Sequence, residues 1–371
     1  MPAFGFRTIA LASAFAVCLL LFGSAPARSD DPVTSAVRFN REIVRIFDRK
    51  CLPCHADGTI GMPLATYREA RPWARAIREE IVEGRMPPWS AARGSVRFTG
   101  DIGLTPRELT TILTWVDGGL PKGDDADLPP AARPPEASAA DVTLQLPPQS
   151  IPGSGEDIVR RVTIAAGLTA DRRVRQLRIA PGDRRLLRAA FASIVPPSGR
   201  GAAAASVWAA AWTPWQPAME PPGDCGFFVP AGSHIAVELH YRGGDAAAVD
   251  RTVLQLRFAP VSEARDCASS VAVRAIRRIA PGRWSGTRGV AHVTTVWALR
   301  PEGVADGGSL EVTAHEPDGR VQVLLWIPRF RADWPAPFVL TRPVTLPAGT
   351  RLRVTAGGAT PAAAAVLAIR G

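Results

Sequence analysis

Two cysteines separated by two residues and followed at once by a histidine, Cys51, Cys54 and His55, constrain this chain more than any other feature. This is the spacing at which two thiols bond to the vinyl groups of a haem while the next imidazole ligates its iron. A thiol redox pair or half of a zinc site is the alternative, but zinc needs a second Cys/His pair at ligand spacing and the sequence has none. We therefore expect one covalently bound haem c.

The sixth iron ligand has to return to the other face of the haem. Met86 lies in a proline-stiffened loop, Arg85-Met86-Pro87-Pro88-Trp89, which can hold a thioether without a mobile backbone. Met62 follows soon after the motif and is more typical of a core residue. The sequence therefore predicts His55 and Met86 as the iron ligands, with Met62 or an open sixth position as the alternatives.

The first 27 residues have the pattern of an export signal. Arg7 precedes an apolar run from about Ile9 to Phe22, and small residues follow in Gly23-Ser24-Ala25-Pro26-Ala27. A retained anchor is the alternative, but the run is shorter than the ~20 apolar residues that span a bilayer. We expect cleavage near Arg28, loss of Cys18 with the signal, no membrane span in the mature chain, and a periplasmic or otherwise exported protein.

Two cysteines then remain outside the haem motif, Cys225 and Cys267. In an oxidising compartment we expect them to form a disulfide, which would close a loop of about 40 residues and stabilise the fold by a few kcal/mol. Two buried free thiols are the alternative.

Length and charge set limits on the whole chain. With 371 residues and 46% hydrophobic content, it is long enough for two or three cores. The formal net charge is +10, but the 44 basic residues are mostly arginines spread along the sequence. Because there is no basic block or nucleic-acid motif, we expect a solvated surface and no nucleic-acid partner, with docking to an acidic redox partner or an anionic membrane surface as the alternative.

Residues 36–123 have the pattern of a small helical domain. Asn40 is expected to cap a helix that runs through Lys50 and delivers the haem motif at its end. A second helix is expected to begin near Pro72 and to stop at Gly84. The residues predicted to share its buried face are Trp73, Ile77 and Ile81.

The third helix has the clearest local signal. Thr105-Pro106-Arg107-Glu108 forms a capping box with proline at the first helical position, and Gly118-Gly119 ends the pattern. The apolar residues that recur between them at helical spacing are Leu109, Ile112, Leu113 and Val116.

Beyond the helices we expect a β architecture in two parts. Residues 124–148 are rich in Pro, Ala and Asp and predict a semi-rigid linker. Short alternating segments such as Ile235–Tyr241 and Arg351–Val354 then follow between Pro and Gly turns, which is typical of sandwiches. We divide them into a first sandwich at 149–263 and a second at 264–371.

An internal echo supports two similar halves. The segment Pro230–Val237 recurs as Pro347–Val354, and Ile179-Ala180-Pro181-Gly182 recurs as Ile279-Ala280-Pro281-Gly282. Each pair combines a proline turn with the start or end of an apolar strand.

A series of short motifs runs through the helical region. They are Phe39-Asn40, the CxxCH motif, Met62-Pro63-Leu64, Arg71-Pro72-Trp73-Ala74, Met86-Pro87-Pro88-Trp89, Leu104-Thr105 and Trp115-Val116-Asp117-Gly118-Gly119. Together they resemble the cytochrome c module that precedes copper type II, ascorbate-dependent monooxygenase-like domains in some bacterial proteins. The resemblance covers nearly the whole region and implies an iron held by histidine and methionine.

The β region carries further motifs: Pro181-Gly182-Asp183-Arg184, Pro230 to Ser233, His240-Tyr241, Pro317-Asp318-Gly319, Pro328-Arg329-Phe330 and Trp334. They resemble landmarks of the tandem jelly rolls of peptidylglycine-hydroxylase-like copper monooxygenases. The resemblance implies a fold of two jelly-roll β-sandwich domains behind the helical cytochrome c domain.

Most copper ligands that this resemblance would bring are missing. The positions that it aligns with metal ligands are occupied by Leu187-Arg188-Ala189-Ala190, Val296-Trp297-Ala298, Gly357 and Ala362 to Leu367, and only His240 stands at a matching ligand position. A mononuclear copper site of this class needs about three side-chain ligands. We expect no copper, with a rearranged site that joins His234, His240, His292 or His315 as the alternative.

Three functions follow from these expectations. The first is an exported electron carrier whose haem c is fixed by Cys51 and Cys54 and ligated by His55 and Met86, with the β region docking an unidentified redox partner protein and no substrate turned over. The second, implied by the resemblance, is a haem-fed copper-dependent monooxygenase-like oxidoreductase. The third is a binding or assembly protein with a mainly structural haem.

Overall fold

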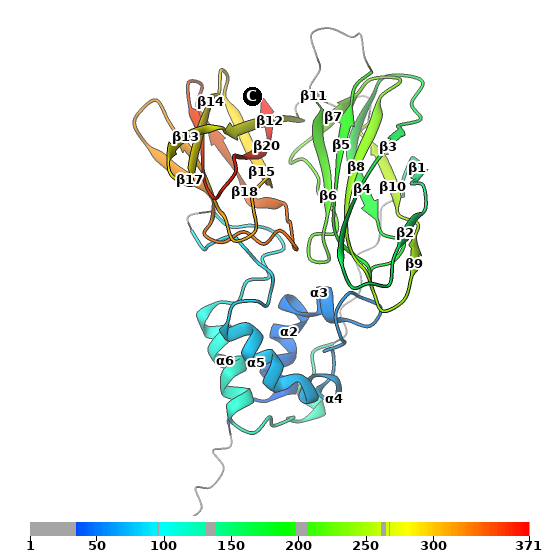
Figure 1. Cartoon of the computed structure of the whole chain (residues 1–371), viewed down its shortest axis with the longest axis vertical. Helices are drawn as coiled ribbons and strands as arrows, with labels where there is room; N and C mark the ends of the chain where they lie inside the picture. Colours follow the sequence, from blue (N-terminus) through cyan, green and yellow to red (C-terminus); the bar gives the residue numbers. More distant parts are fainter. Residues whose placement is uncertain are drawn as a thin grey trace, which may run out of the picture.

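The computed structural model describes residues 35–94, 96–130, 139–197, 206–260, 265–266 and 268–370. A small helical region comes first, and two β-sandwich-like regions, each built from more than one sheet, follow it (Figure 1). The protein is mostly β, as predicted. The predicted export signal, with Cys18 and the expected cleavage near Arg28, lies outside the described residues. In the described part of the chain, no helix is both long enough and apolar enough to cross a bilayer.

The helical region consists of short elements around one apolar core. The elements are η1 (Phe39–Ile43, a π-helical turn), α2 (Val44–Lys50), α3 (Leu52–His55), α4 (Tyr67–Ala70), the 3-10 turn η2 (Arg71–Trp73), α5 (Ala74–Val82), α6 (Pro106–Asp117) and the 3-10 turn η3 (Asp125–Asp127). The rings of Phe39, Phe47 and Trp115 pack together with centroids 5.6 to 6.4 Å apart. The predicted capping box of α6 is present, because the Thr105 hydroxyl accepts from the Glu108 amide and the Glu108 carboxylate accepts from the Thr105 amide.

Two predictions about the helices are wrong. Asn40 does not cap the first helix, which begins at Phe39; its buried side-chain amide instead donates to the Asp124 carbonyl and the Asp125 carboxylate. Trp73 does not share the buried face of Ile77 and Ile81, because it is 45% exposed, whereas each isoleucine is 9% exposed. In both cases the start of the helix is shifted from the position that local residue preferences indicate.

The first sandwich has two main sheets. One contains, in spatial order, β1 (Val142–Gln145), β10 (Val253–Phe258), β4 (Arg172–Ala180), β7 (Cys225–Val229) and β11 (Arg265–Asp266). The other contains β3 (Asp157–Ala165), β8 (His234–Arg242), β5 (Leu187–Val195) and β6 (Val207–Trp212), and a small pair is formed by β2 (Gln149–Ile151) and β9 (Ala248–Asp250). Strand β1 lies within the stretch predicted as a linker.

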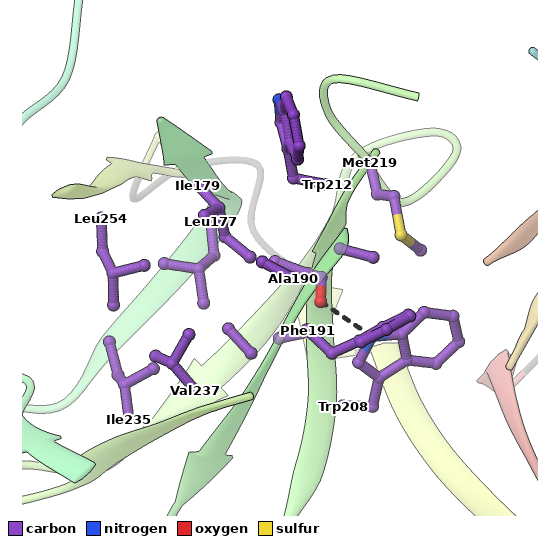
Figure 2. Packing of buried hydrophobic residues seen from close by; sticks show 14 of the residues in the cluster. Leu177, Ile179, Ala190, Phe191, Trp208, Trp212, Met219, Ile235, Val237 and Leu254 are labelled. Atoms are coloured by element: carbon purple, nitrogen blue, oxygen red, sulfur yellow. Dashed lines mark hydrogen bonds between the residues drawn. The ribbon is translucent and has the colours of Figure 1, made fainter. Parts of the chain in front are cut away.

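Alternation along the strands places one face of each sheet in the core. Along β8 the buried residues are Ile235, Val237, Leu239 and Tyr241. Figure 2 shows Ile235 and Val237 opposite Leu177, Ile179 and Leu254 of the other sheet, with Trp208, Phe191 and Met219 further along the same core. The predicted strand at 235–241 is therefore confirmed.

Cys225 is disulfide-bonded. Its predicted partner, Cys267, lies outside the described residues, directly after the short strand β11. Arg265 and Asp266 of that strand pair in parallel with Cys225 and Gly226. The pairing of the two cysteines stays a prediction.

The second sandwich also has two sheets. One is formed by β12 (Ala268–Ala275), β20 (Ala362–Arg370), β15 (Thr294–Glu302) and β18 (Phe338–Leu346). The other is formed by β13 (Arg277–Ala280), β14 (Arg283–Gly289), β19 (Arg351–Gly357), β16 (Ser309–His315) and β17 (Val321–Ile327).

Only the first pair of the internal echo corresponds to equivalent turns, because in the second pair Gly282 has a positive φ of 65° and Gly182 does not. Gly232 and Gly349 both have positive φ, at 76° and 84°, immediately before the interior strands β8 and β19. In each turn the amide after the glycine donates to the proline carbonyl three residues back, over 3.2 Å. This left-handed conformation explains why both turns have glycine at this position.

The connection between α5 and α6 leaves the helical region and runs along the second sandwich. Phe98 pairs with Leu340 as an antiparallel bridge, the Thr99 amide donates to the Val339 carbonyl, and the Thr341 amide donates to the Arg97 carbonyl. Residues 97–99 therefore extend the edge of the sheet at β18.

Candidate haem site

The CxxCH motif forms a helical turn at the end of α2. The amides of Cys54 and His55 both donate to the Cys51 carbonyl, over 3.0 and 2.9 Å. Residues three apart in a helical turn lie on the same side, so both thiols face one side and the imidazole follows directly. Both cysteines are free in the protein chain.

Burial makes both thiols weak acids. It raises the pKa of Cys51 to about 12 and that of Cys54 to about 12. Cysteines that exchange disulfides or carry out redox chemistry have a lowered pKa, because the thiolate is the reactive form. Neither thiol therefore has the lowered pKa that is typical of a thiol redox pair.

A backbone carbonyl sets the tautomer of His55. Its Nδ1 lies 2.9 Å from the Met62 carbonyl oxygen, which can only accept a hydrogen bond. Nδ1 must therefore carry the proton, and the lone pair is on Nε2, as in histidines that ligate a metal through Nε2. Burial lowers the pKa of His55, although this carbonyl contact opposes the effect. The imidazole thus fits the proximal position of a haem.

The loop after the motif is built closely around the imidazole. The Gly61 amide donates to the Cys54 carbonyl over 2.7 Å, and the Leu64 amide donates to the His55 carbonyl over 2.8 Å. A Cβ atom on Gly61 would lie 2.5 Å from His55 Nδ1. The expectation that Met62 fills the core is wrong, because its side chain is 37% exposed. Met62 contributes to the site through its main-chain carbonyl, which a pattern of side chains cannot indicate.

Met86 lies in the loop that follows α5. Its amide donates to the Glu80 carbonyl of that helix over 3.1 Å, and its side chain is half-buried. Three residues later, the ring of Trp89 packs against Phe98 and Phe338, with centroids 6.2 and 5.4 Å away. Met86 as the sixth ligand stays a prediction.

The haem motif lies at the junction of the helical region with the β regions. Helix α3 is at the end of the helical region that faces the two sandwiches (Figure 1). Cys54 is 7% exposed and belongs to one buried cluster with Phe98, Ile102 and Trp215, a cluster that continues into the second sandwich. The positive charge of Arg184, in the turn between β4 and β5, lowers the pKa of Cys54 against the larger effect of burial.

At the position where the resemblance would bring copper, the structure has an ionic cluster. His240 Nε2 lies 2.9 Å from Glu238 Oε1, and Arg300 of the second sandwich donates to the same oxygen over 2.9 Å. The Arg300 guanidinium also lies 3.8 Å from the centroid of the Phe191 ring. The hydrogen bond from His240, and next the charge of Arg300, hold the pKa of Glu238 down to about 2 against desolvation.

Most of the other positions that the resemblance would align with copper ligands are apolar and buried, although Arg188 is an ion-paired exception and Gly357 is half-buried. One buried cluster that crosses between the sandwiches includes Ala189, Ala190, Trp297, Ala298, Ala365 and Leu367. His234 and His292 are exposed, and His315 contacts the Thr313 hydroxyl. Among the described residues, no three His, Cys, Asp or Glu side chains gather in a way that could hold a metal ion.

No protein-family model and no curated protein matches this chain. Among solved structures, an allantoicase is similar at 9% identity over 57% of this chain and 77% of that one, with a TM-score of 0.20. The A223 turret protein of Sulfolobus turreted icosahedral virus is similar at 8% identity over 58% and 98%, with a TM-score of 0.16. An oxalate decarboxylase is similar at 9% identity over 66% and 80%, with a TM-score of 0.15. Likenesses of this size carry no argument about function.

Proposed function

We propose that the protein is an exported electron carrier with one covalently bound haem c. The observation that carries the proposal is the geometry of the CxxCH turn, where two protonated thiols share one side and the His55 tautomer leaves Nε2 free for a metal. When bound, the haem would supply reversible one-electron exchange at its iron. A thiol enzyme with the same cysteine spacing would need at least one thiol with a lowered pKa. Burial raises the pKa of both thiols here.

Each residue of the site has a separate role in this proposal. Cys51 and Cys54 would hold the cofactor covalently, and His55 and Met86 would ligate its iron, with the Met86 thioether raising the reduction potential. The Met62 carbonyl keeps His55 in the required tautomer. Cys54 is buried in the same apolar cluster as Trp215 and Phe98, which keeps this cysteine away from water.

In this proposal the two sandwiches are jelly rolls that have lost copper chemistry and serve to dock a redox partner protein. The apolar side chains at most of the aligned ligand positions and the Glu238–Arg300 ion pair beside His240 support this reading. The haem-fed monooxygenase is the competing proposal, and it requires copper at or near His240.

The test is to produce the full chain in an exporting host that is competent for cytochrome c maturation. We expect an intact mass that includes one haem, a reduced spectrum typical of cytochrome c, and iron near one per chain without tightly bound copper. A colourless secreted protein without the mass increment would refute the proposal, and stoichiometric copper would favour the monooxygenase.

Two histidine variants separate ligation from a general effect of substitution. His55→Gln should abolish the normal spectrum, because the proximal ligand is lost. His292→Gln removes an exposed histidine of the second sandwich and should leave the spectrum unchanged. If both variants had the spectrum of the wild type, His55 would not be a ligand.

A further inference from the structure

The short segment that carries Met86 is attached to the second sandwich on both sides of the methionine. On one side, Arg331 Nη1 donates to the Arg85 carbonyl across 246 positions of sequence. On the other side, the ring of Trp89 packs edge-on against Phe338 of β18. The backbone from Arg85 to Trp89 is therefore held by a domain that lies more than 200 residues further along the chain.

The helical region holds the same segment from the opposite direction. The Arg85 amide donates to the Glu80 carbonyl over 2.9 Å, and its guanidinium forms two bonds with the Glu80 carboxylate, over 2.9 and 2.8 Å. The residue before Met86 thus has its amide and side chain fixed by α5 and its carbonyl fixed by Arg331. The peptide planes on either side of Arg85 can turn only if one of these hydrogen bonds breaks.

Arg331 is itself held in place. Its guanidinium forms two bonds with the Asp333 carboxylate, over 3.1 and 2.7 Å, and the Arg331 side chain is only 26% exposed. The carbonyl of Asp333 accepts from Arg188 of the first sandwich over 3.2 Å, and Arg188 lies over the Trp334 ring and pairs with Asp157. This network joins both sandwiches to the loop of Met86.

We infer that Arg331 is a positioning residue for the sixth iron ligand, and that the second sandwich, not the helical region alone, keeps Met86 in place. The inference rests on the proposed function, in which Met86 ligates the iron. A thioether is a weak neutral ligand, so the fraction of protein with Met86 bound to the iron depends on a rigid backbone around this residue. The β region then has a role in the haem site itself, in addition to docking a partner.

The test compares the wild type with Arg331→Gln as full-length holoproteins. We expect the variant to lose part of the weak far-red band of methionine-ligated ferric haem, to have a lower reduction potential, and to bind carbon monoxide at least tenfold faster when reduced. Phe338→Leu, which weakens the second attachment, should shift the same three readouts in the same direction. Hydrogen exchange at the Met86 amide of the haem-free protein should also become faster in Arg331→Gln.

Arg320→Gln is the matched control. Arg320 belongs to the same sandwich and forms a two-bond pair with Glu316, but it lies at the turn between β16 and β17 and its contacts do not include the Met86 loop. It should leave all four readouts at wild-type values. Wild-type values in both Arg331→Gln and Phe338→Leu would overturn the inference.

The wild type decides the underlying function separately. A wild-type protein without covalent haem refutes the carrier proposal. A haem protein that binds carbon monoxide readily without any substitution refutes Met86 as a ligand, and the inference about Arg331 is then refuted with it. Only a change between the wild type and Arg331→Gln supports the positioning role.

Discussion

At the scale of single residues, the sequence predicts the donors of the candidate haem site but not the groups that orient them. Cys51, Cys54 and His55 are predicted from their spacing, because covalent attachment and ligation of a haem require those side chains at those intervals. The acceptor for His55 Nδ1 is a main-chain carbonyl, which every residue has, so no pattern could point to Met62. The requirement for glycine at position 61 is likewise visible only once the imidazole is seen against its backbone.

Gly61→Ala should therefore damage the site directly. The new Cβ would lie 2.5 Å from His55 Nδ1 and 2.9 Å from the Cys54 carbonyl, so the imidazole or the loop must move. We expect a loss of about 1–3 kcal/mol in the free energy of unfolding and a lower yield of haem-loaded protein. Chemical denaturation and the ratio of haem to protein absorbance measure the two effects.

Gly94→Ala is the control for this substitution, because its Cβ would meet no atom within 4 Å. It should change neither quantity beyond experimental error. Equal haem yields in Gly61→Ala and the wild type would show that the close approach at the imidazole is not needed.

At the scale of elements, a local sequence signal predicts a helix end correctly where no distant contact competes with it. The capping box of α6 and the glycine stop after α5 involve residues that are close in sequence, and both are confirmed. The same local rules predict a helix cap at Asn40 and a buried Trp73, and both predictions are wrong. The amide of Asn40 is taken by Asp124 and Asp125, more than 80 residues away, a tertiary contact that the local pattern does not contain.

Thr105→Ala should measure the contribution of the α6 capping box. It removes the hydroxyl that accepts from the Glu108 amide over 3.1 Å, so a helix-terminal donor loses its partner. We expect a loss of about 1 kcal/mol in the free energy of unfolding, measured by denaturant titration. Thr110→Ala, at an exposed position inside the same helix, should cost no stability, and an equal loss in both variants would refute the capping role.

At the scale of the whole molecule, the sandwiches are joined by contacts that neither half predicts alone. Trp297 of β15 is 1% exposed and its ring lies 6.4 Å from Phe227 of β7, so apolar packing continues from one sandwich to the other. Glu238 and Arg300 form an ion pair across the same boundary. The sequence pattern divides the chain at proline turns and charge, but it contains no signal for which faces of separate sheets meet.

The ion pair predicts how this boundary responds to acid. The pKa of Glu238 falls from its ordinary 4.5 to about 2 in the folded protein. The stabilisation that the ionised Glu238 carboxylate provides is therefore complete above the pKa of the unfolded state, 4.5. It is lost as the pH falls from 4.5 towards 2. Its size is on the order of 3 kcal/mol, and part of it is offset because burial lowers the pKa of Arg300.

Glu238→Gln tests this prediction. Near neutral pH the variant should unfold at lower denaturant concentration than the wild type, and the gap should narrow as the pH is lowered through the range from 4.5 to about 2. Glu302→Gln, whose carboxylate is more exposed and 3.8 Å from Arg300, should show a much smaller gap. A gap of constant size at every pH would exclude titration of Glu238 as the cause.

Because residues 97–99 pair with β18, the helical region is difficult to transfer to another protein. If the helical region were cut out and grafted onto another carrier, Phe98 and Ile102 would leave their buried positions and Leu340 would lose its strand partner. The remaining part of this protein would have an unpaired strand at the edge of its sheet. The transferred helical region would expose apolar side chains that favour aggregation. The helical region and the second sandwich should therefore be engineered and expressed as a single unit.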